Sequence, residues 1–248
     1  MMTPAQRAAL EAALAALRAP ELPSLGKPAP KNFQALEKSG AAGKSAAAAP
    51  RWQDRLMEEL IPRGASVLDL GCGGGQLLQK LLRDKAVRAQ GVELNPAAVM
   101  ECVGRGVPVL QADLDDGLKG FDAGSFDYVV LEETLQTVRQ PLRLLDEMLR
   151  IGRNGMVSFP NFGHWRVRLS LAADGRMPVT PRLPYRWHDT PNIHLFTLQD
   201  FLDWLAGGRA RVAQSWMLCD GEVRAPRPDD PLYAEECLFL LTAAPHGD

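Results

Sequence analysis

A glycine-rich stretch with an acidic neighbour carries the clearest chemistry in this sequence. The residues "LDLGCGGGQ" at 68–76 place Asp69 two positions before Gly71, with Gly73 and Gly75 following. Glycines allow positive φ angles and let a ligand approach the backbone closely. A carboxylate beside such a loop repels a pyrophosphate but accepts hydrogen bonds from an ammonium group. The pattern therefore favours a cationic ligand over a polyphosphate.

Two further carboxylates stand at the ends of apolar segments. Glu93 follows Asp69 by 24 residues, where a carboxylate can accept both hydroxyl groups of a ribose. Asp113 lies in "QADL", within expected reach of an adenine amino group. Acidic residues are common in turns and caps, so each alone also fits a structural role. All three, together with the glycines, predict a site for a nucleoside with a positive charge.

The glycine spacing separates this loop from the dinucleotide fingerprint. That fingerprint, G-x-G-x-x-G, needs glycine where this chain has Gln76. Gln76 and the nearby Asp69 therefore disfavour an oxidoreductase that uses a dinucleotide.

A framework of alternating strands and helices must position these residues. From Arg51 onward, short β-branched runs alternate with helical stretches, which predicts an α/β fold with a doubly wound, seven-stranded, mostly parallel sheet. The strands are expected at 66–71, 88–94, 107–113, 126–132, 155–160, 211–218 and 236–244, and the helices near 75–84, 96–104, 141–151 and 196–206. The last two strands are expected to form an antiparallel hairpin with a long connection at 219–235. Ligands of such sheets bind outside the carboxyl ends of the strands.

Composition narrows the functional classes. The chain has 248 residues, of which 46% are hydrophobic and 23% charged, and a formal net charge of -2, which disfavours general nucleic-acid binding while leaving a local basic patch open. The four cysteines show no zinc spacing, so we expect no metal. Neither a membrane-spanning segment nor a signal peptide is recognisable, and we expect a cytoplasmic protein.

Residues 1–50 differ in composition from the rest. They are rich in Ala, Pro, Gly and Ser, and contain few large side chains to offset the entropy of ordering. We interpret 1–50 as a flexible extension, with a segment that folds on a partner as the alternative. Residues 51–248 form the predicted domain.

The glycine loop and its acids resemble the class I S-adenosylmethionine methyltransferases over residues 50–160. The resemblance implies a Rossmann-like fold and a site for S-adenosylmethionine or S-adenosylhomocysteine. The residues that it assigns to the cofactor are Asp69, Gly71, Gly73, Glu93, Asp113, Leu114 and Gln136.

A more specific resemblance covers residues 52–218. The stretches "SFPNFGHWRVRLSLAADGRMPVTPRLPYRWHDTPNIHLFTLQDF" and "EETLQTVRQP" are similar to the MetW family of methionine biosynthesis proteins. The resemblance implies a bacterial protein that acts with a homoserine O-acyltransferase, either an O-acetyl- or an O-succinyltransferase. It leaves open whether the chain transfers methyl groups, and it says nothing of the oligomeric state.

The region at about 158–195 is expected to be an insertion after the fifth strand. It mixes aromatic residues with five arginines, and Trp and Arg are favoured anchors of protein interfaces. The predicted docking residues are Trp165, Arg166, Arg168, Arg182, Tyr185, Arg186 and Trp187. A pocket for a methyl acceptor and a purely structural cover are the alternatives.

Candidate catalysts are few. His164 is the nearest potential general base, although a buried histidine that packs in a loop is the favoured interpretation. Cys72 has no paired base and is interpreted as a packing residue. The NPPY-type motif of amino-methylating DNA enzymes is absent after the fourth strand, where the chain has "EETL". Two functions follow: an S-adenosylmethionine-binding subunit that regulates homoserine O-acyltransferase, or a small-molecule methyltransferase with Gln136, Asn161 and His164 around the acceptor.

Overall fold

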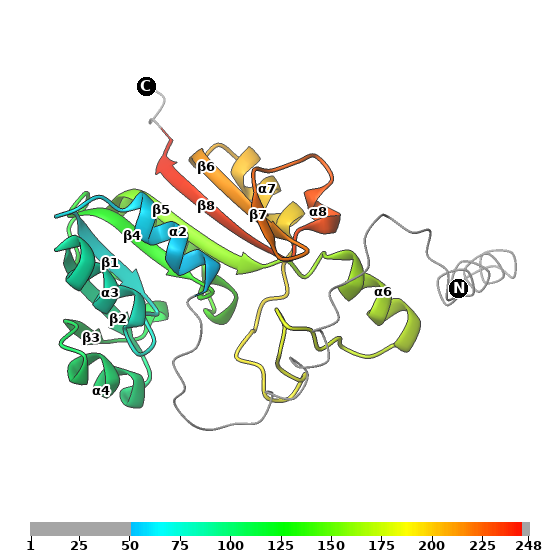
Figure 1. Cartoon of the computed structure of the whole chain (residues 1–248), viewed down its shortest axis with the longest axis horizontal. Coiled ribbons are helices and arrows are strands. Elements are labelled where there is room, and N and C mark those ends of the chain that lie inside the picture. The colour runs from blue at the N-terminus through cyan, green and yellow to red at the C-terminus, as the bar shows by residue number, and fades with distance from the viewer. Residues whose placement is uncertain (1–50, 245–248) are drawn as a thin grey trace, which may run out of the picture. The chain divides into compact units, whose positions relative to one another are not determined.

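The protein is built on one mixed sheet with helices on both faces (Figure 1). The computed structural model describes residues 51–244, so the proposed extension at 1–50 lies outside the described residues. Within them the strands are β1 (Ser66–Leu70), β2 (Arg88–Glu93), β3 (Val109–Gln111), β4 (Phe126–Glu132), β5 (Gly152–Pro160), β6 (Ala210–Cys219), β7 (Glu222–Arg224) and β8 (Glu236–Ala243). The helices are α2 (Trp52–Leu60), α3 (Gln76–Lys85), α4 (Pro96–Gly104), α5 (Pro141–Ile151), α6 (Trp165–Asp174), α7 (Leu198–Ala206) and α8 (Asp230–Tyr233), with short 3-10 turns η2 (Leu114–Asp116) and η3 (Leu135–Thr137).

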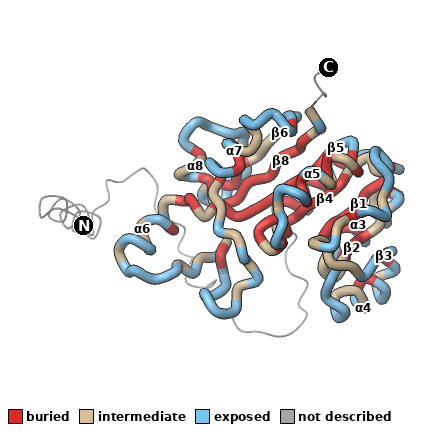
Figure 2. The backbone as a smooth tube through the Cα atoms, turned by 180° about the vertical axis from the view of Figure 1, so that it is seen from behind, coloured by how far each residue is buried: buried red, intermediate tan, exposed pale blue. Residues whose placement is uncertain are grey.

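Alternate residues of the central strands supply two hydrophobic cores. On one face, Val67 of β1 and Val130 of β4 pack with α2, α3 and α4. On the other, Leu68 of β1 and Leu131 of β4 pack with α5 and α7. Since successive side chains of a strand point to opposite faces, both faces of these strands are apolar, as expected for a covered parallel sheet. Figure 2 shows the buried residues concentrated along β1, β4, β5 and β8.

The strand order confirms the doubly wound α/β prediction. The sheet runs β3-β2-β1-β4-β5-β8-β6-β7, and the pairs from β3 to β5 are parallel. β6 and β8 are antiparallel, as expected, and β8 also pairs with β5. The described residues contain eight strands instead of seven, because the connection between β6 and β8 forms the short β7 and the single-turn helix α8.

Some elements differ from the sequence-based expectation. The third strand shrinks from 107–113 to Val109–Gln111, since Pro108 cannot donate to a neighbouring strand and Asp113 caps η2 instead. The helix α2 was not predicted, although it buries Met57 against the first core. The strand β5 begins at Gly152 instead of residue 155 and ends at Pro160 as expected, so the first residues of the proposed 158–195 insertion belong to the sheet.

The order of strands reverses between β1 and β4, which makes their carboxyl ends the switch point of the sheet. In register, Asp69 of β1 lies opposite Val130 of β4, and Glu132 ends β4 two residues later. Polar side chains at the ends of these two strands are therefore brought to the place where open α/β sheets bind ligands.

Residues 165–189 belong to a compact unit separate from the one that contains residues 51–164 and 190–244. The unit begins with α6, and most of its remaining residues lie outside regular structure. One turn within this unit is stabilised by the Leu183 amide, which donates to the Thr180 hydroxyl at 3.0 Å. Figure 2 shows this part of the chain as largely exposed.

Candidate functional site

The glycine loop contains one position that faces open space. Gly71, Gly73 and Gly75 all adopt positive φ angles, of 83°, 53° and 77°. A Cβ on Gly71 would lie 2.5 Å from the Thr134 hydroxyl, and one on Gly75 would lie 2.9 Å from the Cys102 sulfur. A Cβ on Gly73 would meet no described atom within 4 Å. Gly71 and Gly75 are therefore required by packing, whereas Gly73 leaves room for a ligand.

Glu93 is tied to this loop. Its Oε2 accepts from the Gly73 amide at 2.9 Å, and its Oε1 accepts from the Asn95 amide at 2.7 Å. A carboxylate has about four lone-pair positions, so both oxygens retain capacity for further donors such as ribose hydroxyls. The next residue, Leu94, exposes 58% of its surface and offers an apolar contact that the sequence analysis did not identify.

Asp113 and Leu114 lie at the start of η2, and both are half-buried. One oxygen of Asp113 accepts from the Asp115 amide at 2.9 Å, so this residue is a helix cap as well as a candidate adenine contact. Asp115 in turn accepts from the amides of Arg139 and Gln140, which ties η2 to the segment before α5. These contacts hold the backbone of η2, which forms the predicted adenine end of the site, in place.

Asp69 is almost fully buried, with 3% of its surface exposed. Burial raises the pKa of Asp69 to about 7, against the opposing attraction of Arg51 and with smaller contributions from Asp54 and Glu93. Asp69 is therefore poised to change charge close to neutral pH. A cationic ligand beside it would favour the ionised form.

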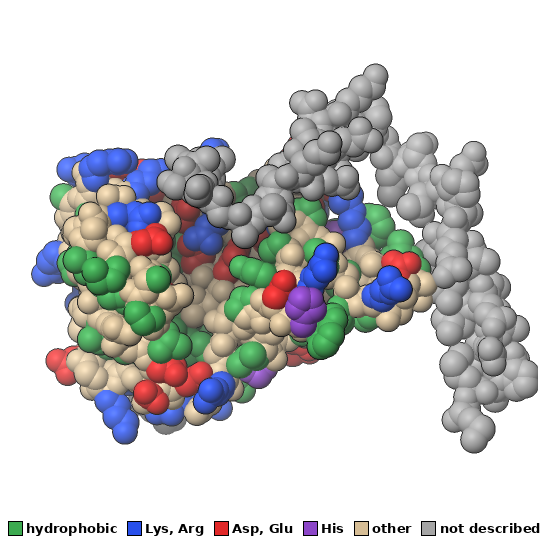
Figure 3. Space-filling view, turned by 90° about the horizontal axis from the view of Figure 1, so that it is seen from below, with side chains coloured by type: hydrophobic (Ala, Val, Ile, Leu, Met, Phe, Trp, Pro, Cys, Tyr) green, Lys and Arg blue, Asp and Glu red, His purple; other side chains and the backbone are tan. Residues whose placement is uncertain are grey.

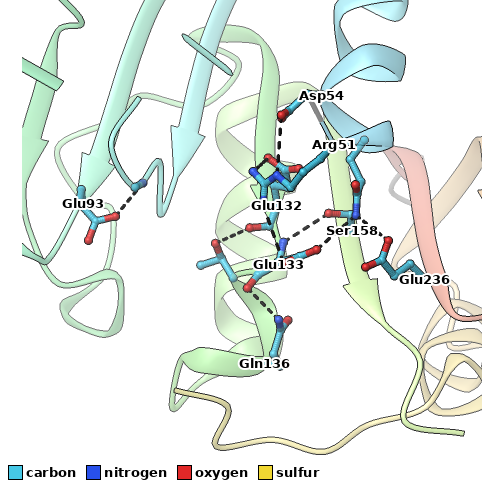
Figure 4. Close-up of polar contacts among 11 residues, drawn as sticks. Arg51, Asp54, Glu93, Glu132, Glu133, Gln136, Ser158 and Glu236 are labelled. Carbon is cyan, nitrogen blue, oxygen red and sulfur yellow. Dashed lines mark hydrogen bonds and ion pairs between the residues drawn. The ribbon is translucent and has the colours of Figure 1, made fainter. Parts of the chain in front are cut away.

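An arginine that the sequence analysis missed lies among the carboxylates at the end of β4 (Figure 4). The Arg51 guanidinium is 2.7 Å from Glu132, 3.7 Å from Asp54 and 3.8 Å from Glu133. Burial raises the pKa of Glu132 well above its usual range, and Arg51 only partly offsets this. The cluster is rich in negative charge, and its arginine can also pair with the carboxylate of a ligand. Arg51 precedes the unpredicted helix α2, and no motif in the sequence marked it.

The start of α2 is fastened to the sheet on the other side of this cluster. Glu236, the first residue of β8, accepts from the Gln53 side-chain amide at 3.1 Å and from the Trp52 indole nitrogen. Both Gln53 and Glu236 are buried, with 1% and 3% exposed. This anchorage holds the first turn of α2, and with it Arg51, over the ends of β4 and β8.

Gln136 lies below Glu133 in the same network (Figure 4). It is 3% exposed, and its side-chain amide donates to the Glu133 carbonyl at 2.8 Å. Its backbone carbonyl accepts from the amides of Ile193 and His194 at 2.9 and 3.0 Å. The structure thus places Gln136 beside the acidic cluster and joins it to a segment from after the insertion.

Two residues of the alternative acceptor site are engaged in holding the turn after β5. The Asn161 side chain donates to the carbonyls of Ala234 and Pro231 and accepts from the amides of Gly163 and Leu198. His164 is 5% exposed, and its amide donates to the Asn161 carbonyl. Asn161 therefore acts as a structural staple between β5, α7 and α8, and His164 lies in the buried turn that it stabilises.

Two cysteines that are distant in sequence meet behind the glycine loop. The sulfurs of Cys72 and Cys102 are 3.9 Å apart, and the Cys102 thiol donates to the Gly73 carbonyl at 3.1 Å. Burial raises the pKa of both thiols, so they stay protonated near neutral pH. This agrees with the interpretation of Cys72 as a packing residue.

The predicted docking residues gather in the separate unit 165–189. Arg166, Arg168 and Arg186 are exposed, as are Tyr185 at 50% and Trp187 at 78%, while Trp165 and Arg182 are half-buried. The Arg166 guanidinium lies 5.1 Å from the centre of the Trp165 ring, and the Trp187 ring contacts His188 edge-on. Trp is among the residues favoured as anchors of protein interfaces, so Trp187 stays a candidate docking residue.

The surface charge is mixed. Figure 3 shows basic and acidic side chains interspersed over the face in view. Among residues 51–244, no group of three or more His, Cys, Asp or Glu residues is arranged to hold a metal ion. No helix in the same part of the chain is long and apolar enough to cross a membrane.

Solved structures with this fold are numerous. A possible histamine N-methyltransferase from Thermotoga maritima superimposes with a TM-score of 0.54 at 20% identity, covering 77% of this chain and 86% of the other. The cyclase SpnF gives 0.55 at 16% identity, covering 81% and 86%. At these identities the likeness concerns the fold, which is that of the class I methyltransferases.

Two curated proteins are similar in sequence. The bifunctional methionine biosynthesis protein MetXA/MetW of Rhodopirellula baltica is 38% identical over 195 residues, which cover 74% of this chain but only 31% of that protein. A ubiquinone biosynthesis O-methyltransferase of Xanthomonas axonopodis pv. citri is 31% identical over 137 residues, covering 52% of this chain and 56% of the other. This chain thus spans about a third and about half of these relatives.

The family model described as methionine biosynthesis protein MetW matches residues 51–241. The match takes in the glycine loop, the Arg51 cluster, the separate unit and the antiparallel strands, which is most of the described chain. The chain therefore belongs to the MetW family of methionine biosynthesis proteins.

Proposed function

We propose that this protein binds S-adenosylmethionine outside the carboxyl ends of β1 to β4 and, through this binding, regulates a homoserine O-acyltransferase. The observation that carries the ligand assignment is the opening at Gly73, flanked by the buried Asp69 and by Glu93. A glycine at positive φ with free space beyond it is a place where a ligand can lie against the backbone.

The residues present fit both ends of the cofactor. Glu93 would accept from the ribose hydroxyls, and Asp113 and Leu114 would contact the adenine. Asp69 would face the amino group, and Arg51, 2.7 Å from Glu132, would exchange this partner for the ligand carboxylate. S-adenosylmethionine carries a positive sulfonium and an ammonium group, so the excess of carboxylates around Arg51 suits its charge.

The bifunctional relative supports the partner. Its name joins MetXA and MetW in one chain, and this protein corresponds to 31% of its length. Parts that form one polypeptide in one organism are good candidates for association when they are separate. The docking surface would be the exposed aromatic and basic residues of unit 165–189, with Trp187 as its most exposed anchor.

Regulation requires that the ligand bind the free and the partner-bound protein with different affinity, because equal affinities shift no equilibrium. Since S-adenosylmethionine is made from methionine, such a difference would report the output of the pathway to its acyl-transfer step.

The test combines the purified protein with the homoserine O-acyltransferase of the same organism. Acyltransferase rates are measured with and without this protein, over a range of S-adenosylmethionine concentrations. We expect the rate to change on addition of the protein and to change again as the ligand saturates it. Equal rates under all conditions would refute the regulatory role, and calorimetry with S-adenosylmethionine, S-adenosylhomocysteine and NAD would separately decide the ligand class.

A second candidate, methyl transfer to a small molecule, is favoured by the identity to an O-methyltransferase. It predicts formation of S-adenosylhomocysteine when the protein is incubated with S-adenosylmethionine and candidate metabolites. The same preparations used for calorimetry decide between binding alone and turnover.

A further inference from the structure

The end of α4 holds the glycine loop through two side chains. The Cys102 thiol donates to the Gly73 carbonyl at 3.1 Å, and the Arg105 guanidinium donates to the Gly74 carbonyl at 2.6 Å. Cys102 lies in the last turn of α4, and Arg105 directly follows the helix with helical backbone angles, so the two side chains share one face. Two consecutive carbonyls of the loop are therefore fixed by one element.

The glycines at 74 and 75 allow this close approach. A Cβ on Gly74 would lie 2.9 Å from the Arg105 guanidinium and 2.5 Å from the Glu101 carboxylate. A Cβ on Gly75 would lie 2.9 Å from the Cys102 sulfur. Because non-bonded atoms do not normally come so close, only glycine lets the backbone of the loop lie against the end of α4.

Both donors keep their protons near neutral pH. Burial raises the pKa of Cys102, so this residue stays a thiol and can donate. Arg105 is always charged, and a hydrogen bond from a charged donor is roughly twice as strong as a neutral one. Arg105 also pairs with Glu101 at 2.9 Å, but the Glu101 side chain is 56% exposed, so this pair contributes little by itself. The contact of Arg105 that matters for the loop is the one with the Gly74 carbonyl.

These contacts set the direction of a peptide group in the loop. In a planar trans peptide the carbonyl and the following amide point opposite ways. Because the Gly73 carbonyl points to Cys102, the Gly74 amide points away from α4. The other amides of the loop have acceptors within the protein, namely the backbone carbonyls of Val92 and Cys72 and the carboxylate of Glu93. Within residues 51–244 the Gly74 amide has no acceptor, so it is available to a ligand.

We propose that Cys102 and Arg105 are positioning residues of the cofactor site. From α4 they hold the carbonyls of Gly73 and Gly74, and they thereby present the Gly74 amide and the open side of Gly73 to the ligand. Each acts through the backbone of the loop and not by touching the ligand. The inference rests on the proposed function, because the ligand whose binding it supports is S-adenosylmethionine.

Paired variants separate the two hydrogen bonds from packing. Cys102→Ala removes the donor, whereas Cys102→Ser leaves a similar cavity and keeps an O–H group. Arg105→Met removes the donor, and Arg105→Lys keeps a charged one. We expect the affinity for S-adenosylmethionine in calorimetry to fall about tenfold in the Ala and Met variants and to be largely restored in the Ser and Lys variants. Arg83→Met, at a 70% exposed arginine paired with Asp84, is the control and should bind like the wild type.

Nuclear magnetic resonance observes the loop without any ligand. Cys102→Ala should shift the carbonyl carbon resonance of Gly73, and Arg105→Met should shift that of Gly74, whereas Arg83→Met should shift neither. Lower stability in urea with unchanged affinity would assign both residues a purely structural role and overturn the proposal. An equal loss of affinity in Cys102→Ala and Cys102→Ser would also overturn it, since the donor would then not matter.

The wild type distinguishes this failure from failure of the proposed function. A wild-type protein that does not bind S-adenosylmethionine would overturn the ligand assignment and this inference together. A wild type that binds, with all four variants of Cys102 and Arg105 at equal affinity, would overturn this inference alone.

Discussion

Arg51 and Glu132 form a short ion pair, 2.7 Å between Nη2 and Oε2, at the switch point of the sheet. Glu132 is the last residue of β4, and its side chain is 6% exposed, whereas that of Arg51 is 51% exposed. The pair therefore consists of a buried carboxyl group, that of Glu132, and a half-exposed guanidinium group, that of Arg51. Such an arrangement lets a ligand carboxylate reach the guanidinium from outside while the acid stays in the protein.

Replacement of Arg51 should weaken cofactor binding. We expect Arg51→Gln to lower the affinity for S-adenosylmethionine at least tenfold, about 1.4 kcal/mol, because the ligand carboxylate loses its charged partner. Isothermal titration calorimetry measures the change. Arg209→Gln, which breaks the exposed pair with Asp146, is the matched control and should bind like the wild type. Equal affinity in both variants would remove Arg51 from the site.

Adding a methyl group at Gly73 should weaken ligand binding, because the Cβ would occupy the space proposed for the ligand. Gly73→Ala and Gly64→Ala both place a Cβ at positive φ, of 53° and 75°, with no described atom within 4 Å. Each should cost about 1 kcal/mol in stability through backbone strain. Only Gly73→Ala should lose S-adenosylmethionine binding, measured by calorimetry beside urea unfolding. Loss of binding in Gly64→Ala as well would trace the effect to strain.

Glu93 should contribute to the affinity for S-adenosylmethionine, because each of its carboxylate oxygens accepts one backbone amide and retains a lone pair for a ribose hydroxyl. Glu93→Gln keeps the length of the side chain but replaces one acceptor oxygen with a donor group, so we expect a tenfold to hundredfold weaker complex, about 1.4–3 kcal/mol. Glu101→Gln, at an exposed residue paired with Arg105, is the comparison. If both variants bind alike, the ribose contact assigned to Glu93 is incorrect.

The titration of Asp69 should appear in the stability of the free protein. Its pKa rises from 3.8 to about 7 in the folded state, so the folded protein holds a proton that the unfolded chain releases in this range. Stability contributed by this group is therefore lost as the pH rises from about 4 to 7, with an upper bound of about 4 kcal/mol. Asp69→Asn should flatten this part of the profile in urea unfolding between pH 5 and 8. The exposed variant Asp146→Asn should keep the wild-type slope, and a slope unchanged in Asp69→Asn would show that Asp69 is ionised throughout.

Trp187 should matter to the partner and not to the fold. Its side chain is 78% exposed, so Trp187→Ala should change the free energy of unfolding by no more than about 0.5 kcal/mol, the usual range of surface substitutions. We expect it to abolish most of the effect on acyltransferase rate, while Leu171→Ala, at a 46% exposed residue of the same unit, does not. Acyltransferase rates measured at increasing concentrations of each variant test both expectations. A normal response with Trp187→Ala would place the docking surface elsewhere.

Much of the fold follows from local pattern. The helices at Pro96–Gly104 and Pro141–Ile151 match the expected ranges because proline at the first helical position and apolar spacing are local signals. The capping box of Thr197 and Asp200 at the start of α7 is likewise visible in four consecutive residues. The helix α2, which buries Gln53 and Met57, was not predicted. It begins directly after the change in composition at residue 51 that marks the predicted domain boundary.

The sequence by itself determined the glycine loop, the carboxylates Asp69, Glu93 and Asp113 at successive strand ends, and the motifs that mark the MetW family. Tertiary structure alone decided which of those glycines faces open space, and it brought Arg51 to Glu132 across 81 residues and His194 to Gln136 across an entire insertion. The physical reason is that spacing along a chain encodes periodicity and turns, whereas contacts between distant segments depend on how the helices and strands pack. Burial, which sets the charge of Asp69 and Glu132, is likewise a property of that packing.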